Sequence, residues 1–392
     1  MDSLTHLAAG ALTPLVFSKT PIRAAVIGFG IAAGSLPDMD FIFGVSPEAR
    51  LVLHRGVTHA LFWQPVFVLL AVLPFYIWMH CKKNGTPPGC HGSLSIERAG
   101  IDTGVMASDG CIGFFTMYCM ALAAGFMHIF LDGMTTFGTQ ILLPFSDFRA
   151  GLPAMYIVDP FLTVPLLALL TMALRQPPAI VPYSVDGSRG KIDAGRGVAV
   201  VSPKTRQLAA AGIVWALLYP LAVLGINNIA ARSLSADLAP GETLVLLPEP
   251  FAPVFLKGVI DEGAAYRVGT VNLFTLDSKT IREHYPKVDP ALYDGLKRQM
   301  PLFGIFEKFC SLMAQEERPV SYATQASYAR PVREYAFVDM RYILSRESPG
   351  RLIGLGEAYF VLEARVNDTG ALVAYRFLLR GEGDRDSVWI EL

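Results

Sequence analysis

The sequence predicts an α-helical membrane domain with about five to six membrane segments, followed by a small α+β domain outside the membrane. The chain has 392 residues, and only 17% are charged, whereas soluble domains usually carry about 25%. Long apolar runs recur in residues 1–231. Residues 232–392 are more polar and contain patterns typical of short strands and helices. We therefore place the boundary between the two predicted domains after residue 231.

The apolar runs set the positions of the predicted membrane segments. A bilayer core about 30 Å thick needs roughly 20 apolar residues per helix. Five runs are predicted spans, at residues 23–36, 57–78, 112–131, 156–174 and 208–230. The apolar run at residues 4–17 is shorter than a full span needs. It therefore forms either a tilted helix or half of a re-entrant hairpin, which is tolerated where it lines a polar cavity.

Basic residues in short loops mark the cytoplasmic side of such a protein. Here they follow alternate segments, as Lys19, Arg23, Lys82, Lys83, Arg98, Arg175, Arg189, Lys191, Arg196, Lys204 and Arg206. The opposite loops hold only Arg50, Arg55 and Arg149. The sequence therefore predicts a multi-pass protein of the bacterial inner membrane with its second domain in the periplasm. The net charge of −1 gives no reason to expect a nucleic-acid partner.

Two hairpins and one helix are predicted in the second domain. Residues 255–260 and 266–274 alternate like paired strands around a turn. Residues 356–366 and 372–379 flank Asn367-Asp368-Thr369-Gly370, which is typical of a hairpin turn. Residues 278–315 have helical spacing, with one apolar face made by Leu302, Ile305, Phe306 and Phe309.

Ionisable side chains of the first domain gather at the ends of its apolar segments. By the predicted topology, all of these ends lie on the outer side of the membrane. The set comprises Asp2, His6, Asp38, Asp40, His54, Arg55, His59, His128, Asp132 and Asp159. Within it, His128 and Asp132 are four residues apart and share one helical face.

This set predicts a divalent metal site, because imidazole and carboxylate groups are the ligands that zinc and manganese prefer. We expect zinc, with manganese as the alternative, and one or two ions. The predicted ligands are Asp2, His6, Asp38, Asp40, His54, His59, His128 and Asp132. An ion would relieve the repulsion between Asp38 and Asp40 and lower the pKa of a water to about 7. Asp40, His59 and Arg55 are the predicted catalytic residues, with Arg55 binding a phosphate-like group.

Each motif by itself has an ordinary structural explanation. Asp2 could cap a helix that carries His6 on its surface. Asp38 and Asp40 could belong to a plain turn. His128 and Asp132 could form a buried hydrogen-bonded pair. The gathering of these motifs at one membrane face favours the metal site. A second candidate zinc site, with a spacing unlike that of a zinc finger, comprises His80, Cys81, Cys90 and His91.

The order of these motifs resembles a known family. The matching motifs are Met1-Asp2-(x)2-Thr5-His6, Gly34-(x)2-Pro37-Asp38-x-Asp40, His54-Arg55-Gly56-x-Thr58-His59 and His128-(x)3-Asp132. They are similar to those of YdjM/YbcI-type inner-membrane proteins, and Thr136-Phe137-Gly138-Thr139-Gln140 is similar to the YfhP-like branch. The resemblance covers about residues 1–175 and implies a membrane-bound metal-dependent hydrolase, by analogy with zinc-dependent phospholipases.

The sequence thus favours hydrolysis of a phosphoester or ester bond in a lipid-like or small phosphorylated substrate. Membrane lipid would be its partner, and the reaction would take place at the outer membrane–water interface. Two alternatives stay open, an ion or proton transporter and a non-catalytic, metal-stabilised membrane anchor. A transporter would favour ionisable groups at mid-membrane and on both sides, whereas here they cluster at one end.

Overall fold

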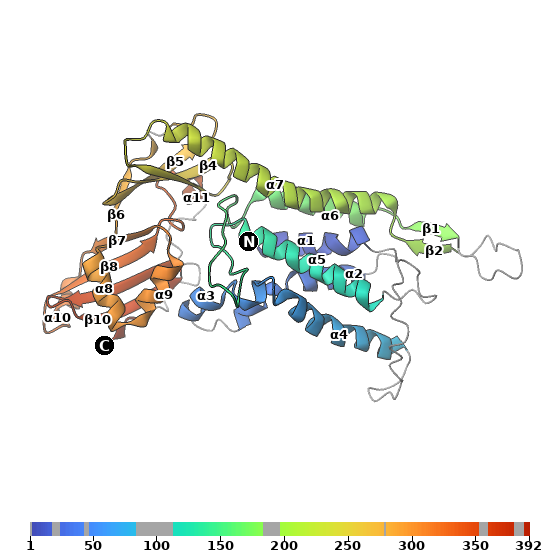
Figure 1. The fold of residues 1–392 in the computed structure, drawn as a ribbon, viewed down its shortest axis with the longest axis horizontal. Coiled ribbons are helices and arrows are strands. Elements are labelled where there is room, and N and C mark those ends of the chain that lie inside the picture. Colours follow the sequence, from blue (N-terminus) through green and yellow to red (C-terminus); the bar gives the residue numbers. More distant parts are fainter. Residues whose placement is uncertain are drawn as a thin grey trace, which may run out of the picture.

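The computed structural model describes residues 2–17, 24–42, 47–83, 113–182, 197–277, 280–352, 360–379 and 388–392. A helical N-terminal region and a strand-rich C-terminal region follow one another along the long axis of the molecule (Figure 1). The helix α7 (Pro203–Ser235) extends from the first region to the second. The predicted boundary after residue 231 therefore falls near the end of a continuous helix.

The described part of the N-terminal region is made of helices and one small hairpin. In chain order these are α1 (Ser3–Phe17), α2 (Ala24–Gly34), the 3-10 helix η1 (Pro37–Ile42), α3 (Pro47–Leu53), the 3-10 helix η2 (Val57–His59), α4 (Gln64–Lys83), α5 (Phe114–Gly133), α6 (Pro160–Leu174) and the strands β1 (Ala179–Pro182) and β2 (Gly197–Val200) before α7. The helix α1 packs against α2, α5, α6 and α7, which places it at the centre of the bundle.

Among the described residues, two helices are long and apolar enough to cross a membrane, α5 and α7. A third candidate span is the bent pair Ala49–His59 and Gln64–Trp78, whose two parts meet at 74°. The helices α1 and α6 have 15 residues each, so each is only about 22 Å long against a bilayer core of about 30 Å. The structure therefore supports two or three spans, and the predicted five to six are not confirmed.

The predicted span at residues 57–78 is not one continuous helix, because residues at and just before its start form hydrogen bonds to Asp40 instead of helical ones. The backbone N–H of Arg55 and the hydroxyl of Thr58 both donate to the Asp40 carboxylate, at 2.8 and 3.4 Å. Arg55 also has a left-handed backbone, with φ 57°, which does not continue a helix. As a result α4 begins only at Gln64.

Glycines allow α1 and α2 to approach closely. A Cβ atom on Gly30 would lie 2.4 Å from the carbonyl oxygen of Gly10, and one on Gly34 would lie 2.9 Å from the Gly10 Cα. No other residue fits at these contacts without moving the backbone. This close packing fixes the start of η1, which follows α2, beside the centre of the bundle.

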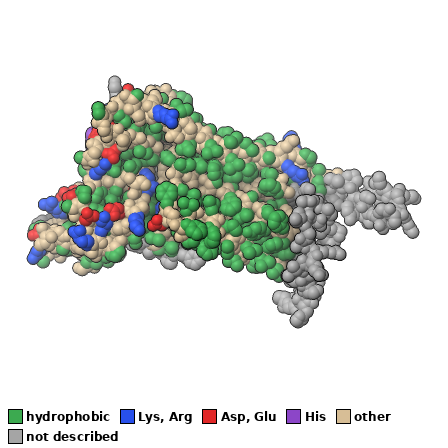
Figure 2. Space-filling model, viewed as in Figure 1, with side chains coloured by type: hydrophobic (Ala, Val, Ile, Leu, Met, Phe, Trp, Pro, Cys, Tyr) green, Lys and Arg blue, Asp and Glu red, His purple; other side chains and the backbone are tan. Residues whose placement is uncertain are grey.

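On the face shown in Figure 2, hydrophobic side chains cover most of the helical region, whereas charged side chains gather over the C-terminal region. Exposed members of the apolar surface include Leu70, Leu73, Val164, Leu218 and Ile229. Soluble monomers rarely expose apolar patches larger than a few hundred Å². The apolar surface therefore fits contact with lipid.

The C-terminal region contains two antiparallel sheets. The first has the order β3 (Thr243–Pro248), β4 (Phe255–Asp261), β5 (Ala265–Asn272) and β6 (Glu283–Pro286). The second has the order β11 (Ile390–Glu391), β10 (Leu372–Leu379), β9 (Phe360–Asn367), β8 (Val332–Asp339) and β7 (Met313–Arg318). Both predicted hairpins are present, and their turns contain left-handed glycines, Gly263 at φ 90° and Gly370 at φ 81°.

The single helix predicted over residues 278–315 is wrong. That stretch holds β6, the helices α8 (Pro290–Gln299) and α9 (Pro301–Phe309), and the start of β7; the helices α10 (Tyr322–Ala326) and α11 (Pro349–Leu352) complete the region. Proline stands at the first position of both α8 and α9, and it cannot continue a preceding helix. Of the predicted apolar face, Leu302, Phe306 and Phe309 are buried, but Ile305 is 37% exposed.

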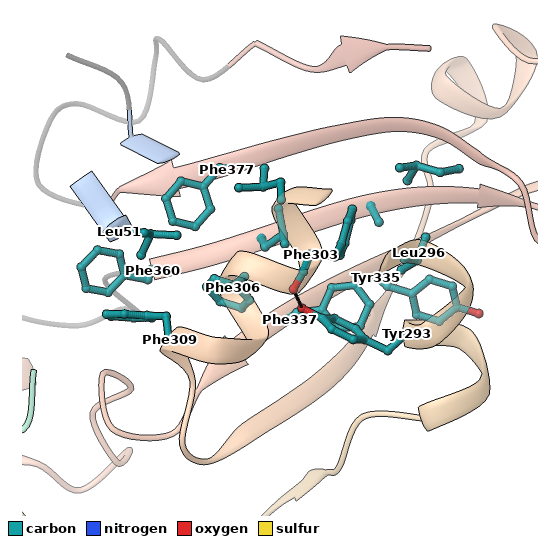
Figure 3. Packing of buried hydrophobic residues seen from close by; sticks show 14 of the residues in the cluster. Leu51, Tyr293, Leu296, Phe303, Phe306, Phe309, Tyr335, Phe337, Phe360 and Phe377 are labelled. Carbon is teal, nitrogen blue, oxygen red and sulfur yellow. Dashed lines mark hydrogen bonds between the residues drawn. The ribbon is translucent and has the colours of Figure 1, made fainter. Parts of the chain in front are cut away.

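An aromatic cluster joins the two regions. Leu51, from α3, lies among Phe306, Phe360 and Phe377 of the C-terminal region (Figure 3). Phe137, which follows α5, belongs to the same cluster, and its ring lies 5.3 Å from that of Phe309. The C-terminal region is therefore packed against two segments of the helical region, α3 and the loop that follows α5.

We expect Leu51→Ala to destabilise this junction by about 2–5 kcal/mol, because truncating a buried leucine leaves a cavity. The measurement is the thermal unfolding midpoint of the detergent-solubilised protein. The matched control is Val52→Ala, since Val52 is 44% exposed and surface changes usually stay within about 0.5 kcal/mol. Equal midpoints for the two variants would contradict the proposed packing of the junction.

Candidate metal centre

Four side chains from three segments meet at the end of the helical bundle nearest the C-terminal region. They are Asp38 of η1, His59 of η2, and His128 and Asp132 of α5. Each offers one ligand atom, and these atoms all lie within 4.8 Å of one another. The side chains of His59, His128 and Asp132 are buried, whereas that of Asp38 is 34% exposed. The group therefore opens to its surroundings at Asp38.

The spacing of the four donor atoms fits one metal ion. His59 Nε2 lies 3.6 Å from Asp38 Oδ1 and 3.3 Å from Asp132 Oδ2. His128 Nε2 lies 3.4 Å from each of the same two oxygens. Ligands bound at about 2.0–2.1 Å in a tetrahedron are about 3.3–3.4 Å apart. The nitrogen–oxygen distances thus match a tetrahedral set of two imidazoles and two carboxylates.

The other ring nitrogens leave both Nε2 atoms available as ligands. His128 Nδ1 donates to the carbonyl oxygen of Gly34 at 2.7 Å. His59 Nδ1 lies 3.1 Å from the Thr58 hydroxyl oxygen, with which it shares a hydrogen bond, and 3.4 Å from Asp40 Oδ2. Metal-binding histidines generally use one nitrogen in this way, which directs the lone pair of the other to the ion. Within the part of the chain that the structure describes, both Nε2 atoms are buried without a hydrogen bond, so an ion would satisfy them.

Asp40 lies behind His59 and supports it. Its carboxylate accepts from the Arg55 N–H, from His54 Nδ1 at 3.2 Å and from the Thr58 hydroxyl. Asp40 and His54 were predicted as ligands, and Asp40 also as a catalytic residue, but neither belongs to the group of four. The geometry instead gives Asp40 the role of fixing the turn that carries His59.

Asp132 is held from two sides. His6 Nε2 donates to Asp132 Oδ1 at 3.1 Å, and the His6 ring stacks on that of His128 with centroids 3.6 Å apart. Arg55 Nε lies 3.0 Å from Asp132 Oδ2. His6 is therefore a buried neighbour of the group and neither a surface residue nor one of the four donors.

Arg55 has a different environment from the one predicted. Its side chain is only 5% exposed, and Nη1 donates to the Thr135 hydroxyl at 2.7 Å. Its guanidinium also lies over the Phe137 ring, 4.9 Å from the centroid. We expected Arg55 to bind a phosphate-like group, but in the structure its charge is paired with Asp132.

Asp2 is a helix cap, as in the ordinary explanation of its motif. Its carboxylate accepts from the N–H of Thr5 at 3.0 Å and from the Thr5 hydroxyl at 2.7 Å. A side chain that satisfies the first turn of α1 in this way is not directed to the four donors. The predicted role of Asp2 as a ligand is therefore not supported by the geometry.

Comparison with known proteins gives one family match, to the YdjM inner membrane protein family over residues 1–231. The chain belongs to this family. It is 23% identical over 184 residues to the uncharacterized protein YfhP of Bacillus subtilis (strain 168). The aligned stretch covers 44% of this chain and 46% of that protein. The match thus spans about half the length of that relative. No solved structure matches the chain.

The YdjM match includes all four donor residues, and the family description agrees with the apolar surface of the helical region. The strand-rich C-terminal region lies beyond it. The resemblance drawn from the motif order is therefore confirmed, and the chain is an inner membrane protein by family.

The charges of the YdjM site leave room for a cation. Among the described residues, Asp38, Asp40 and Asp132 lie within one cluster, and Arg55 is the arginine that forms an ion pair with one of these carboxylates. Burial acts to raise the pKa of Asp38, but the imidazoles of His128 and His59 hold that pKa well below its usual range. Three carboxylates beside one guanidinium are balanced either by a divalent ion or by protonated histidines.

Two supporting contacts had no role in the sequence prediction. Phe137 lies against both Arg55 and His54, and the Gly34 carbonyl accepts from His128. Phe137 belongs to a motif that the resemblance includes, which was the only signal for it. In the second candidate zinc site, Cys90 and His91 lie outside the described residues, as do the side chains of His80 and Cys81. So do most of the basic loop residues that predict the orientation.

Proposed function

We propose that this YdjM-family protein is a membrane-bound metal-dependent hydrolase that acts on a phosphoester or ester bond of a lipid-like substrate. The observation that carries the proposal is the spacing of the two buried Nε2 atoms and two carboxylate oxygens, which fits one ion. This set of donors is polar, yet it lies at the end of an apolar helical bundle. Such a position suits a head group at the membrane–water interface.

Zinc and manganese are the ions that fit these donors best, since both accept imidazole and carboxylate ligands. His59, His128 and Asp132 are the buried residues that would hold the ion, and Asp38 faces the opening. Catalytic zinc sites commonly use three protein ligands and keep one position accessible. A divalent ion in such a site supplies Lewis acidity and the activation of water at neutral pH.

The residues around the donors have separate tasks in this proposal. Arg55 and His6 hold the Asp132 carboxylate in place, and Asp40 holds His59. Asp38 is the one carboxylate of the group with an exposed side chain, so in a site that keeps three protein ligands it is the donor that would give up its place at the ion to water and accept a proton from it. We therefore assign the role of base to Asp38, whereas Asp40, which the sequence predicted as a catalytic residue, supports His59.

Apolar side chains beside the opening support a lipid-like substrate. Met39 and Ile42, on η1, and Val57, on η2, are exposed large hydrophobic residues close in sequence to the donors. A head group bound at Asp38 would lie next to this apolar surface. We place the site and the C-terminal region on the periplasmic side, in keeping with the pattern of basic loops.

The test is an assay in detergent, because a solubilised protein has no two compartments and transport cannot occur. The purified protein is analysed for zinc and manganese and then incubated with a panel of phospholipids and prenyl phosphates. We expect turnover of at least one substrate, loss of turnover on chelation, and recovery when zinc or manganese is restored. A protein that retains no metal and turns over no member of the panel would overturn the proposal.

A second candidate function is a metal-stabilised anchor for the C-terminal region. The observation that favours it is the position of Phe137, whose ring contacts His54 and Arg55 at the site and Phe309 of the C-terminal region. This role predicts that chelation makes the C-terminal region more sensitive to proteases while no substrate is turned over. Turnover that depends on the metal would favour the hydrolase instead.

A further inference from the structure

A cavity lined by apolar residues lies between α2, α4 and α5. Its volume is about 460 Å³, and small residues on all three helices leave the space. Its lining includes Gly28 of α2, Leu36 two residues after that helix, Phe75 and Trp78 of α4, and Ala121 of α5. Because the lining is almost wholly apolar, the cavity does not offer the two or more polar partners that an ordered water needs.

One end of the cavity lies near the metal centre. Leu36 lines the cavity and is separated from Asp38 by a single residue. Ala121 and His128 are seven residues apart on α5, so they share a face and are about 10 Å apart along the helix. The Gly34 carbonyl, which bonds His128, comes from the same end of α2. The cavity therefore extends from the site toward the middle of the helical bundle.

The length of the cavity suits one hydrocarbon chain. Its lining runs from Gly28 on α2 to Leu36, two residues past the end of that helix, and from Val68 to Trp78 on α4, which is about 12–15 Å. This is about half of a bilayer core of about 30 Å, the depth that a chain from one leaflet reaches. The helices α4 and α5 are themselves candidate membrane spans, so lipid is the solvent around them.

We propose that this cavity binds one hydrocarbon chain of a membrane lipid whose head group lies at Asp38 and the metal centre. The binding of a chain stands on the cavity alone, whereas the role of that lipid as substrate rests on the proposed function. The cavity would select lipids by the presence of a long apolar chain, and the donors would select the head group. Short water-soluble esters would then be poor substrates.

Two glycines provide a matched pair of variants. A Cβ atom at Gly28 or at Gly225 meets nothing within 4 Å, so a larger side chain is tolerated locally at both positions. Gly28 lines the cavity, whereas Gly225 lies on α7, away from it. Gly28→Phe should fill the cavity, and Gly225→Phe adds the same side chain to an apolar surface elsewhere. Ala71→Leu, from α4, fills the same cavity from its other side and serves if Gly28→Phe does not fold.

The probe is phosphatidylglycerol with a diazirine on one acyl chain, in vesicles of phosphatidylethanolamine and phosphatidylglycerol. After illumination, the labelled residues are located by peptide mass spectrometry. We expect label on Leu36 and Phe75 in the wild type and in Gly225→Phe, and its loss to background in Gly28→Phe. Label on Leu70 and Leu73, which are exposed on α4, should be equal in all variants. Equal label on Leu36 and Phe75 in Gly28→Phe and in the wild type would overturn the inference.

A further arm separates this inference from the proposed function. His128→Ala removes a metal donor but no residue of the cavity lining, so we expect it to keep the label on Leu36 and Phe75. The same label in wild-type protein that holds no metal and turns over no lipid would leave chain binding intact and overturn only the hydrolase. If Gly28→Phe loses the label yet hydrolyses long-chain lipids as the wild type does, the bound chain is not that of the substrate, and that part of the inference is wrong.

Discussion

His128→Ala is expected to weaken binding of the divalent ion by more than about 100-fold. Removing a residue that only supports a ligand typically costs about 10–100-fold in metal affinity, and His128 is itself a donor. Its Nε2 atom lies 3.4 Å from the oxygens of both carboxylates in the group. The measurement is the zinc content of purified protein after equilibration with a competing chelator of known affinity.

The control is His54→Ala, because His54 has the same side chain and lies close to the site without belonging to the donors. Its Nδ1 bonds Asp40, and its side chain is 38% exposed. We expect His54→Ala to keep most of its metal, and Asp40→Asn to lose about 10–100-fold in affinity as a supporting residue. A loss in His54→Ala as large as that in His128→Ala would place His54 among the ligands and contradict the assigned set.

All four donors could be predicted from the sequence, but they could not be separated from their neighbours. The ends of the apolar segments bring Asp38, His59 and His128 to one end of the helical bundle, whichever way each side chain points. Asp38 and Asp40 differ by two residues in a tight 3-10 turn, so one faces the donors and the other faces the turn behind His59. That difference depends on tertiary contacts that no periodicity contains.

The fold could be predicted where local chemistry decides it. The turns at Gly263 and Gly370 require a left-handed residue, and both hairpins are present. The break before α4 is a different case, because residues 57–78 are apolar enough for one helix. It arises from hydrogen bonds to Asp40, which is distant in the chain. The helix predicted over residues 278–315 is wrong because Pro290 and Pro301 stand at the first positions of α8 and α9, where neither can continue a preceding helix.

Arg55→Met is expected to destabilise the metal-free protein by roughly 3–5 kcal/mol, because breaking a buried ion pair leaves an uncompensated charge. Asp132 is 1% exposed, and Arg55 Nε lies 3.0 Å from its Oδ2. A divalent ion at the same carboxylate would replace the lost positive charge. The measurement is the thermal unfolding midpoint in detergent, with a chelator and with zinc. Zinc at 100 times its dissociation constant should stabilise the folded protein by about 2.7 kcal/mol.

The comparison that decides this prediction is Arg149→Met. Arg149 also lies near Phe137, but it donates to the backbone carbonyls of Leu51 and His54. Its loss leaves carbonyl groups unsatisfied, and the carboxylate whose charge acts on it is Asp40, which is not one of the four donors. Zinc should therefore raise the midpoint of Arg149→Met no more than it raises that of the wild type. Arg55→Met should instead show a larger rise with zinc than either protein. If zinc raised the midpoints of the wild type, Arg55→Met and Arg149→Met equally, zinc would not be bound at the Asp132 carboxylate. The site would then be a hydrogen-bonded cluster of histidine and aspartate.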